Sequence, residues 1–404
     1  MIDGAMTKQA RQLWTALCIM FLFCISCGGN SYKKGQELLQ QGDYNSAILQ
    51  LRVAETRQPG EWRIKRDLGV AFFKNRQTNF AIAKLNQARQ LKLDEPSTLL
   101  YLGLSYEAAD KLDESNATYR ALASLNIDPI LRKEILVRMR DNQITELRKE
   151  VKQSIADWQA GRETAITPNT VGVLYFRNVS EWDEMNPVLK GLAEVIAVQL
   201  QRVRNLRVVD RLKIQLLLDE LRLSSAEFLD QIRASDIGRL LNAERLIFGG
   251  VERLDETSIR ISAGVVYSES GKLAEDGIEV SGSISDILDL DKKLLLDLVK
   301  DLGIGLNDQL FNDLVNRPLV ANSQAFLAFC RGLDFEDQQI FSQARHHYNN
   351  ALRIEPSFEL AKRKLLQLPE HRLNISEMER LVSQHRHHDN TDLPQPAFAD
   401  LATN

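Results

Sequence analysis

The chain has 404 residues, of which 44% are hydrophobic and 26% are charged, and its formal net charge is −4. This length allows two or three domains of ordinary size, and the composition is that of a globular chain rather than a disordered one. The small net charge excludes a general affinity for polyanions, so we expect no nucleic-acid partner.

The first residues have the features of a secretory leader. Lys8 and Arg11 precede an apolar run over residues 13–25. The run is shorter than the roughly 20 residues needed to span a bilayer and is typical of a signal-peptide core. Ser26 and Cys27 follow it. This order predicts that residues 1–26 are a signal peptide, with an uncleaved anchor or simple secretion as the alternatives.

The end of the leader resembles the bacterial lipobox, in which a small residue precedes a cysteine that is cleaved and acylated. Cys24 stands where leucine is usual. The resemblance implies lipidation of Cys27 and anchoring by its acyl chains. Gly28 follows, and no aspartate stands at that position to signal retention in the inner membrane. We therefore expect a protein of the outer membrane that faces the periplasm.

Three glycines mark an internal repeat in the first half of the chain. Gly35, Gly69 and Gly103 are 34 residues apart, with alanines and large apolar residues at equivalent places around each. This pattern resembles the tetratricopeptide repeat, a helical hairpin of 34 residues. It predicts an all-α solenoid over residues 27–165, with a capping helix over about 130–160.

Near residue 171 the apolar period changes from that of a helix to that of strands. The run "VGVLYF" (171–176) is apolar on both faces, as a buried strand is. Short connections join three later expected strands, over 245–251, 258–268 and 273–280, so we predict an antiparallel meander in a mixed sheet covered by helices. The expected fold class is thus α+β and multidomain, with a central α/β domain over 166–315.

Several segments of this domain resemble the curli production assembly/transport component (CsgG) family. They are "VGVLYFRNVS", "GLAEVIAVQL", "LRVVDR" and "IGRLLNAERLIFGGV", with Asn242 in place of the usual glycine. The resemblance covers nearly all of 170–306. It implies a mixed-sheet domain that forms homo-oligomers.

The helical period returns after Pro318. Gly332, Ala344, Tyr348 and Ala351 repeat the earlier template, so we expect a C-terminal tetratricopeptide-like repeat over 318–384. A single repeat cannot bury its own apolar face, so it needs the next helix, the mixed domain or another subunit. Residues 385–404 are polar without a period, which predicts disorder.

The sequence contains no motif for a cofactor or a catalytic metal. It lacks the nucleotide-binding, zinc-protease and nucleophile-elbow patterns. His385, His387 and His388 lie in the expected disordered tail, and Cys330 is expected to be a buried apolar residue. We therefore expect no enzyme activity, no cofactor and no metal site.

Charge is uneven along the chain. Residues 28–165 carry 22 basic and 18 acidic side chains, whereas 166–315 carry 17 basic and 25 acidic ones. A groove on the repeats is expected to bind other envelope proteins, and the candidate contacts are Arg63, Lys65, Arg66, Lys74 and Arg76. A solvated helix surface is the alternative interpretation of these charges.

The predicted function is a non-enzymatic outer-membrane lipoprotein. It would act as a periplasmic scaffold or adaptor in the assembly or secretion of an envelope or surface structure, through protein–protein binding. Two alternatives remain: an oligomeric curli-type secretion channel, and a regulator of a peptidoglycan synthase. The 258–280 hairpin is long enough for a channel, but its alternating pattern also fits a sheet packed on helices.

Overall fold

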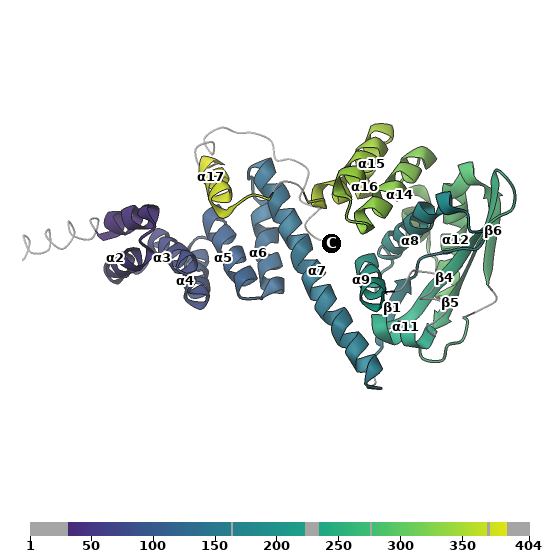
Figure 1. Ribbon diagram of the computed structural model, residues 1–404, viewed down its shortest axis with the longest axis horizontal. Coiled ribbons are helices and arrows are strands. Elements are labelled where there is room, and N and C mark those ends of the chain that lie inside the picture. The colour runs from purple at the N-terminus through teal and green to yellow at the C-terminus, as the bar shows by residue number, and fades with distance from the viewer. Residues whose placement is uncertain (1–30, 163–164, 223–233, 275–276, 370–371, 386–404) are drawn as a thin grey trace, which may run out of the picture. The chain divides into compact units, whose positions relative to one another are not determined.

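A computed structural model describes residues 31–162, 165–222, 234–274, 277–369 and 372–385 (Figure 1). The predicted leader, Cys27, and residues 386–404 of the predicted tail lie outside the described residues. The chain divides into two compact units. Unit 1 takes its described residues from Met1–Asn142 and His371–Asn404, and unit 2 from Gln143–Glu370.

Unit 1 is a series of helical hairpins, as the 34-residue period predicts. Helix 31–41 pairs with α2, α3 pairs with α4, and α5 pairs with α6, and each hairpin stacks on the next. The bounds are α2 (Tyr44–Arg57), α3 (Trp62–Lys74), α4 (Thr78–Leu91), α5 (Pro96–Ala108), α6 (Leu112–Ser124) and α7 (Pro129–Gln159). The predicted solenoid is therefore present.

The repeated glycines let the two helices of each hairpin approach closely. A Cβ on Gly35, Gly69 or Gly103 would lie 2.3–2.7 Å from the nearest atom of a large side chain 16 residues later in the sequence. Those side chains are Leu51, Leu85 and Tyr119. No real Cβ tolerates such a distance, so only glycine permits this packing. The period seen in the sequence is thus a packing constraint repeated three times.

The long helix α7 belongs to the cores of both units. Leu131 and Ile135 are buried with the repeats of unit 1, whereas Val151 is buried in the core of unit 2. The sequence predicts this helix as a cap that continues into the next domain, and the structure confirms its extent almost residue for residue.

The helix α17 (Ile375–His385) belongs to unit 1, although it follows all of unit 2 in the sequence. Met378, Leu381 and Val382 are buried in the same core as the repeats. The sequence predicts these residues within the C-terminal repeat over 318–384, whereas the structure places them with unit 1. The apolar side of α17 is covered by α5 rather than by the helices that precede it.

Unit 2 is built on a mixed sheet of six strands within the described residues. Its strands are β1 (Thr167–Val173), β2 (Arg177–Asn178), β3 (Arg207–Val208), β4 (Ala243–Arg253), β5 (Ser258–Tyr267) and β6 (Ile278–Ser283). The order is β3-β1-β4-β5-β6, with β2 also on β4. Strands β4, β5 and β6 are antiparallel neighbours, so the predicted meander is confirmed.

Helices cover this sheet. Helix α12 packs on β5 and β6, α8 packs on β1, and α11 packs on β4. Ile259, Ile261 and Val265 of β5 are buried in the core, as the packed-sheet interpretation predicts. The bounds are η1 (Asp183–Met185), α8 (Asn186–Leu200), α9 (Arg211–Leu221), α11 (Ala234–Leu241), η2 (Ile284–Asp286), α12 (Ile287–Asp301), α13 (Asp308–Phe311) and η3 (Asn312–Asn316).

A further hairpin of the repeat type completes unit 2. Helices α14 (Ser323–Asp337) and α15 (Phe341–Ile354) pair at Gly332, where a Cβ would lie 2.5 Å from the Tyr348 ring. Helix α14 also packs on α8, where Gly191 makes room for the buried Cys330, and α16 (Glu359–Gln367) packs on α15. Of the expected coverings, the structure thus shows the mixed domain and the next helix.

The close contact at Gly103 predicts a stability effect. Gly103→Ala would force its new Cβ against the Tyr119 ring and lower the free energy of unfolding by about 1–3 kcal/mol. Gly60→Ala is the control, because no atom lies within 4 Å of a Cβ at that position. The midpoint of urea unfolding, followed by circular dichroism, would measure both. Equal midpoints for the two variants would contradict the packing account.

Candidate protein-binding face

The first helices of successive repeats form one face of unit 1. We call it the A-helix face and define it by Lys74 on α3, Tyr101 on α5, and Glu134 and Asp141 on α7. The helices α3 and α5 contact each other, and the Phe73 and Tyr101 rings lie edge to face at 5.5 Å. This face combines a cation, a phenol and two carboxylates with apolar surface.

Helix α17 lies on this face (Figure 1). Its start is fixed by a capping box. Asn374 Oδ1 accepts a hydrogen bond from the Glu377 backbone N–H at 2.9 Å, and Glu377 Oε2 accepts one from the Asn374 N–H at 2.8 Å. Such a reciprocal pair satisfies two backbone donors at a helix start. The local sequence "NISE" therefore specifies where α17 begins.

Glu379 of α17 is held by two helices of the A-helix face. Lys74 Nζ lies 2.9 Å from its carboxylate, and the Tyr101 hydroxyl donates a hydrogen bond to it. Burial and the neighbouring carboxylate raise the pKa of Tyr101, so its hydroxyl stays protonated as the donor. Lys74 also lies 6.0 Å from the centre of the Tyr101 ring. One carboxylate thus connects α17 to α3 and α5.

Arg372, which precedes α17, makes the matching contact with α7. Its guanidinium pairs with Asp141 and lies 3.3 Å from Glu134. Glu134 is buried, and it also pairs with Arg138 at 2.8 Å and accepts a hydrogen bond from the Leu373 N–H at 3.3 Å. The A-helix face therefore recognises an acidic residue near one end and an arginine near the other.

The five basic residues predicted as partner contacts do not form one free stripe. Lys65 pairs with Glu55 at 2.8 Å, Arg66 with Asp67 at 2.7 Å, and Arg63 with Glu61 at 3.0 Å. Lys74 contacts α17, as described above. Arg76 is exposed in the turn after α3. The structure brings Lys74 alone of these five to a bound helix, and more than half of the Arg63 side chain is exposed.

The remaining residues of the face were missed by the sequence analysis. Tyr101, Glu134, Asp141 and Glu379 are far apart in the chain, and nothing in their local sequence joins them. The available signal was the capping box at Asn374, followed by apolar residues at helical spacing. That signal predicts an amphipathic helix that needs a surface to cover it.

Unit 2 contains a buried network of charges between the mixed domain and its repeat-type hairpin. The Arg211 guanidinium lies 3.1 Å from Glu194 and 2.8 Å from Asp337, and it donates a hydrogen bond to the Tyr175 hydroxyl at 2.9 Å. Lys364 of α16 lies 3.3 Å from Glu194. Burial opposes ionisation of Glu194, but Lys364 and Arg211 together lower its pKa. These charges are mutually compensated, so the network fixes α8 and α9 against α14 and α16.

Removing Arg211 should therefore lower the free energy of unfolding. Arg211→Ala leaves Glu194 and Asp337 buried without their shared cation, and we expect a loss of about 3–5 kcal/mol in unfolding free energy. The exposed Arg204→Ala should change it by less than about 0.5 kcal/mol. Urea unfolding of both variants would measure the difference. A small loss for Arg211→Ala would show that the network is not stabilising.

Asp291 of α12 is a buried carboxyl with one hydrogen bond, from Gln199 Nε2 at 3.2 Å. Burial raises its pKa from 3.8 to about 7, although Lys292 acts in the opposite direction. The folded state thus keeps a proton that the unfolded chain loses near pH 4. Stability from this group is complete below pH 4 and is lost as the pH rises towards 7.

Asp291→Asn should remove this pH dependence. We expect the free energy of unfolding of the variant to rise relative to that of the wild type as the pH increases from 4 to 7. The difference reaches up to about 4 kcal/mol at pH 7, because the amide carries no charge to bury. Asp297→Asn on the exposed side of the same helix is the control. Thermal unfolding across this pH range would measure the effect. Parallel pH profiles for wild type and Asp291→Asn would contradict the assignment.

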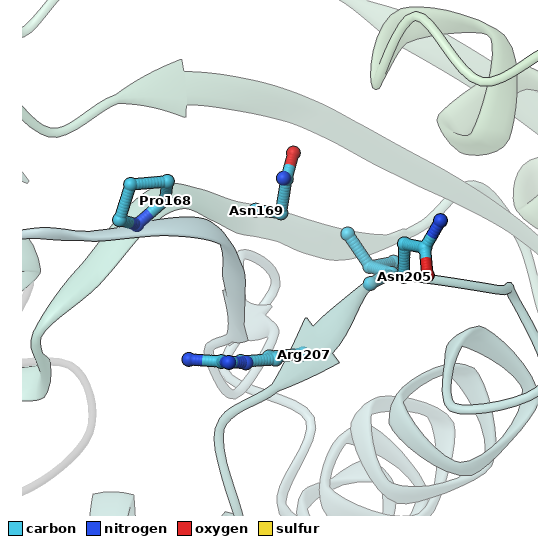
Figure 2. Close-up of a pocket in the computed structure, with 5 residues that line it drawn as sticks. Pro168, Asn169, Asn205 and Arg207 are labelled. Carbon is cyan, nitrogen blue, oxygen red and sulfur yellow. The ribbon is translucent and has the colours of Figure 1, made fainter.

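A surface pocket of about 500 Å³ lies at the β1 and β3 edge of the sheet. Figure 2 shows Pro168, Asn169, Asn205 and Arg207 around it, and Leu206 completes its lining. One guanidinium and two amides supply neither a nucleophile nor a general base, so the pocket does not assemble a catalytic set. Within the described residues, no three His, Cys, Asp or Glu side chains are grouped to hold a metal ion.

The fold and the A-helix face define the class of protein: a tetratricopeptide-repeat solenoid joined to a mixed-sheet domain with a further repeat-type hairpin. The family model for the curli production assembly/transport component CsgG matches residues 154–289. This part of the chain is therefore a CsgG-family domain, and the predicted resemblance is confirmed. The match includes the end of α7 and stops within α12.

No curated protein is significantly similar to this chain in sequence. Several solved structures show distant likenesses, among them the following three. Lipoprotein GNA1162 from Neisseria meningitidis is 16% identical, covering 35% of this chain and all of its own, with a TM-score of 0.26. A tetratricopeptide repeat protein from Parabacteroides merdae is 14% identical over 84% and 98% of the two chains, with a TM-score of 0.28.

Yeast Tom70 is 13% identical over 90% of this chain and 69% of its own, with a TM-score of 0.29. At such scores the assignment of the repeats depends on their 34-residue period and glycine contacts rather than on these likenesses. The described part of the chain has no helix with both the length and the apolar character to cross a membrane.

Proposed function

We propose that this protein is a non-enzymatic scaffold of the bacterial envelope that binds other proteins through its repeats. The observation that carries the proposal is the A-helix face, on which Lys74, Tyr101, Glu134 and Asp141 hold a short amphipathic helix. Stacked helical repeats present surfaces of this kind to partner segments. The proposed role is the assembly or secretion of an envelope or surface structure, in keeping with the CsgG-family domain.

The proposal includes an acyl anchor on Cys27 and a position at the outer membrane, facing the periplasm. Support comes from the order of the leader: basic residues, a short apolar run, then Ser26 and Cys27. Two or more acyl chains would hold the protein at a membrane without a spanning helix.

Self-association through the CsgG-family domain is a further part of the proposal. Strand β6 is at one end of the strand order and pairs with β5 on one side. A strand in that position presents unpaired backbone groups to a second sheet. Sedimentation of the purified chain would measure the number of subunits, and a monomer at all concentrations would contradict this part.

Lipidation has a direct test. Cells fed radiolabelled palmitate should label the wild-type protein, whereas Cys27→Ala should lose essentially all label because its acyl acceptor is absent. Cys330→Ala is the control, since Cys330 is buried. Equal labelling of wild type and Cys27→Ala would end the lipoprotein assignment.

Partner binding is tested by affinity purification of the detergent-solubilised protein from envelopes. Arg63→Glu with Arg76→Glu should reduce recovery of the partner about tenfold or more at low salt, because both side chains are exposed on unit 1. Lys293→Glu with Arg204→Glu makes the same charge change on unit 2 as a control.

Three outcomes would redirect the proposal. Recovery of no protein would remove the scaffold function. Recovery of a cell-wall synthase would favour the regulatory alternative over assembly, whereas conductance of the purified oligomer in a planar bilayer would favour the channel.

A further inference from the structure

We propose that α17 is an intramolecular ligand of the A-helix face, and that a partner bearing a similar amphipathic helix displaces it to bind. This inference rests on the proposed protein-binding function and adds to it the chemistry of the partner and a built-in competitor. It is carried by the contacts of α17, not by the repeats alone.

The position of α17 differs from that of a repeat helix. The repeats of unit 1 are continuous in sequence, whereas α17 follows after all of unit 2. The repeat hairpins meet at a glycine with a large residue pressed against it, whereas none of the described glycines has an atom of α17 among its nearest neighbours. The polar contacts of this segment with α3, α5 and α7 run instead through the side chains of Arg372 and Glu379 and the Leu373 backbone N–H. This is how a bound peptide contacts a receptor.

The stability of α17 depends on the face that it covers. It has 11 residues, which is fewer than an isolated helix needs to persist in water. Among its described residues, Met378, Leu381 and Val382 are buried in the core of unit 1, and the half-buried Ile375 packs against that core. A segment with so few buried side chains opens at a lower free energy than the helices beneath it. Helix α17 is therefore a ligand that can dissociate from the A-helix face.

The contacts also define what the face accepts. Apolar residues of α17 recur at positions 375, 378 and 382, one helical turn apart, and cover α5. The carboxylate of Glu379 contacts Lys74 and Tyr101. Arg372, which precedes the helix, pairs with Glu134 and Asp141. A partner that fits would carry an amphipathic helix with a preceding arginine and an acidic residue about seven positions later.

Tethering makes α17 a strong competitor. A ligand attached to its receptor acts at an effective concentration of the order of millimolar, so a free helix of equal intrinsic affinity binds weakly while α17 is seated. Loosening α17 should raise the affinity of the face for a free helix. This difference between the two forms of one chain is what the experiment measures.

The experiment uses the full chain in detergent and a fluorescent peptide with the sequence of residues 372–385. In the released variant, Met378→Ser and Leu381→Ser remove two of the three buried apolar anchors of α17 but leave the A-helix face intact. We expect the peptide to bind the released variant at least about 30-fold more tightly than it binds the wild type, by fluorescence anisotropy. Equal affinities would overturn the proposal.

A charge exchange identifies the site of binding. Lys74→Glu in the released variant should weaken the peptide about tenfold, and a peptide with Glu379→Lys should recover the loss. A peptide with Arg380→Ala is the matched control, because Arg380 is exposed on α17, and it should bind like the original. If the Glu379→Lys peptide does not recover the affinity, the A-helix face does not recognise this carboxylate.

If the released variant does not fold, hydrogen exchange of the wild-type chain tests the proposal without it. Backbone amides of 376–385 should exchange at least about 100-fold faster than those of the buried middle of α5. Exchange of both helices at one rate would make α17 an integral part of unit 1 and overturn the proposal. If the envelope partner binds wild type and released variant equally, α17 is no competitor, while the scaffold function stands.

Discussion

A helical hairpin leaves an apolar face uncovered, and the whole architecture follows from how this chain covers such faces. Gly35, Gly69 and Gly103 bring the two helices of each hairpin together, which hides their inner sides but not their outer ones. Stacking of α2 on α3 and of α4 on α5 covers outer sides, and α7 packs on the last hairpin. The hairpin of α14 and α15 solves the same problem with a different neighbour, since it packs on α8 of the mixed domain.

The two solutions use different chemistry. The contact between α14 and α8 is apolar at Gly191 and Cys330 and is surrounded by the buried charges of Arg211, Glu194 and Asp337. Buried ion pairs resist separation, because breaking one leaves a charge without a partner in a low dielectric. The contact of α17 with the A-helix face has fewer buried side chains, and both Lys74 and Glu379 are partly exposed. We therefore expect the contact of α14 with α8 to stay closed and the contact of α17 with the A-helix face to open and exchange.

The sequence predicted what depends on local repetition. The 34-residue period of glycines specified the repeats, and alternating apolar residues with short connections specified the meander of β4, β5 and β6. It placed a strand over 273–280, whereas β6 begins at Ile278 and Leu273 makes only an isolated bridge to Val266. Local repetition in the sequence could not predict the A-helix face. Lys74 and Glu379 are 305 residues apart, and no period in the chain marks them as neighbours.

The proposed exchange of α17 for another protein on the A-helix face is tested most directly by crosslinking in living cells. A photoreactive amino acid in place of Phe73, which is half-buried beside Tyr101, would report what lies on this face. We expect two products: an internal link to residues 372–385 and a link to one envelope protein, with the second increasing when Met378 and Leu381 are replaced by serine. Internal links alone, in every variant, would contradict it.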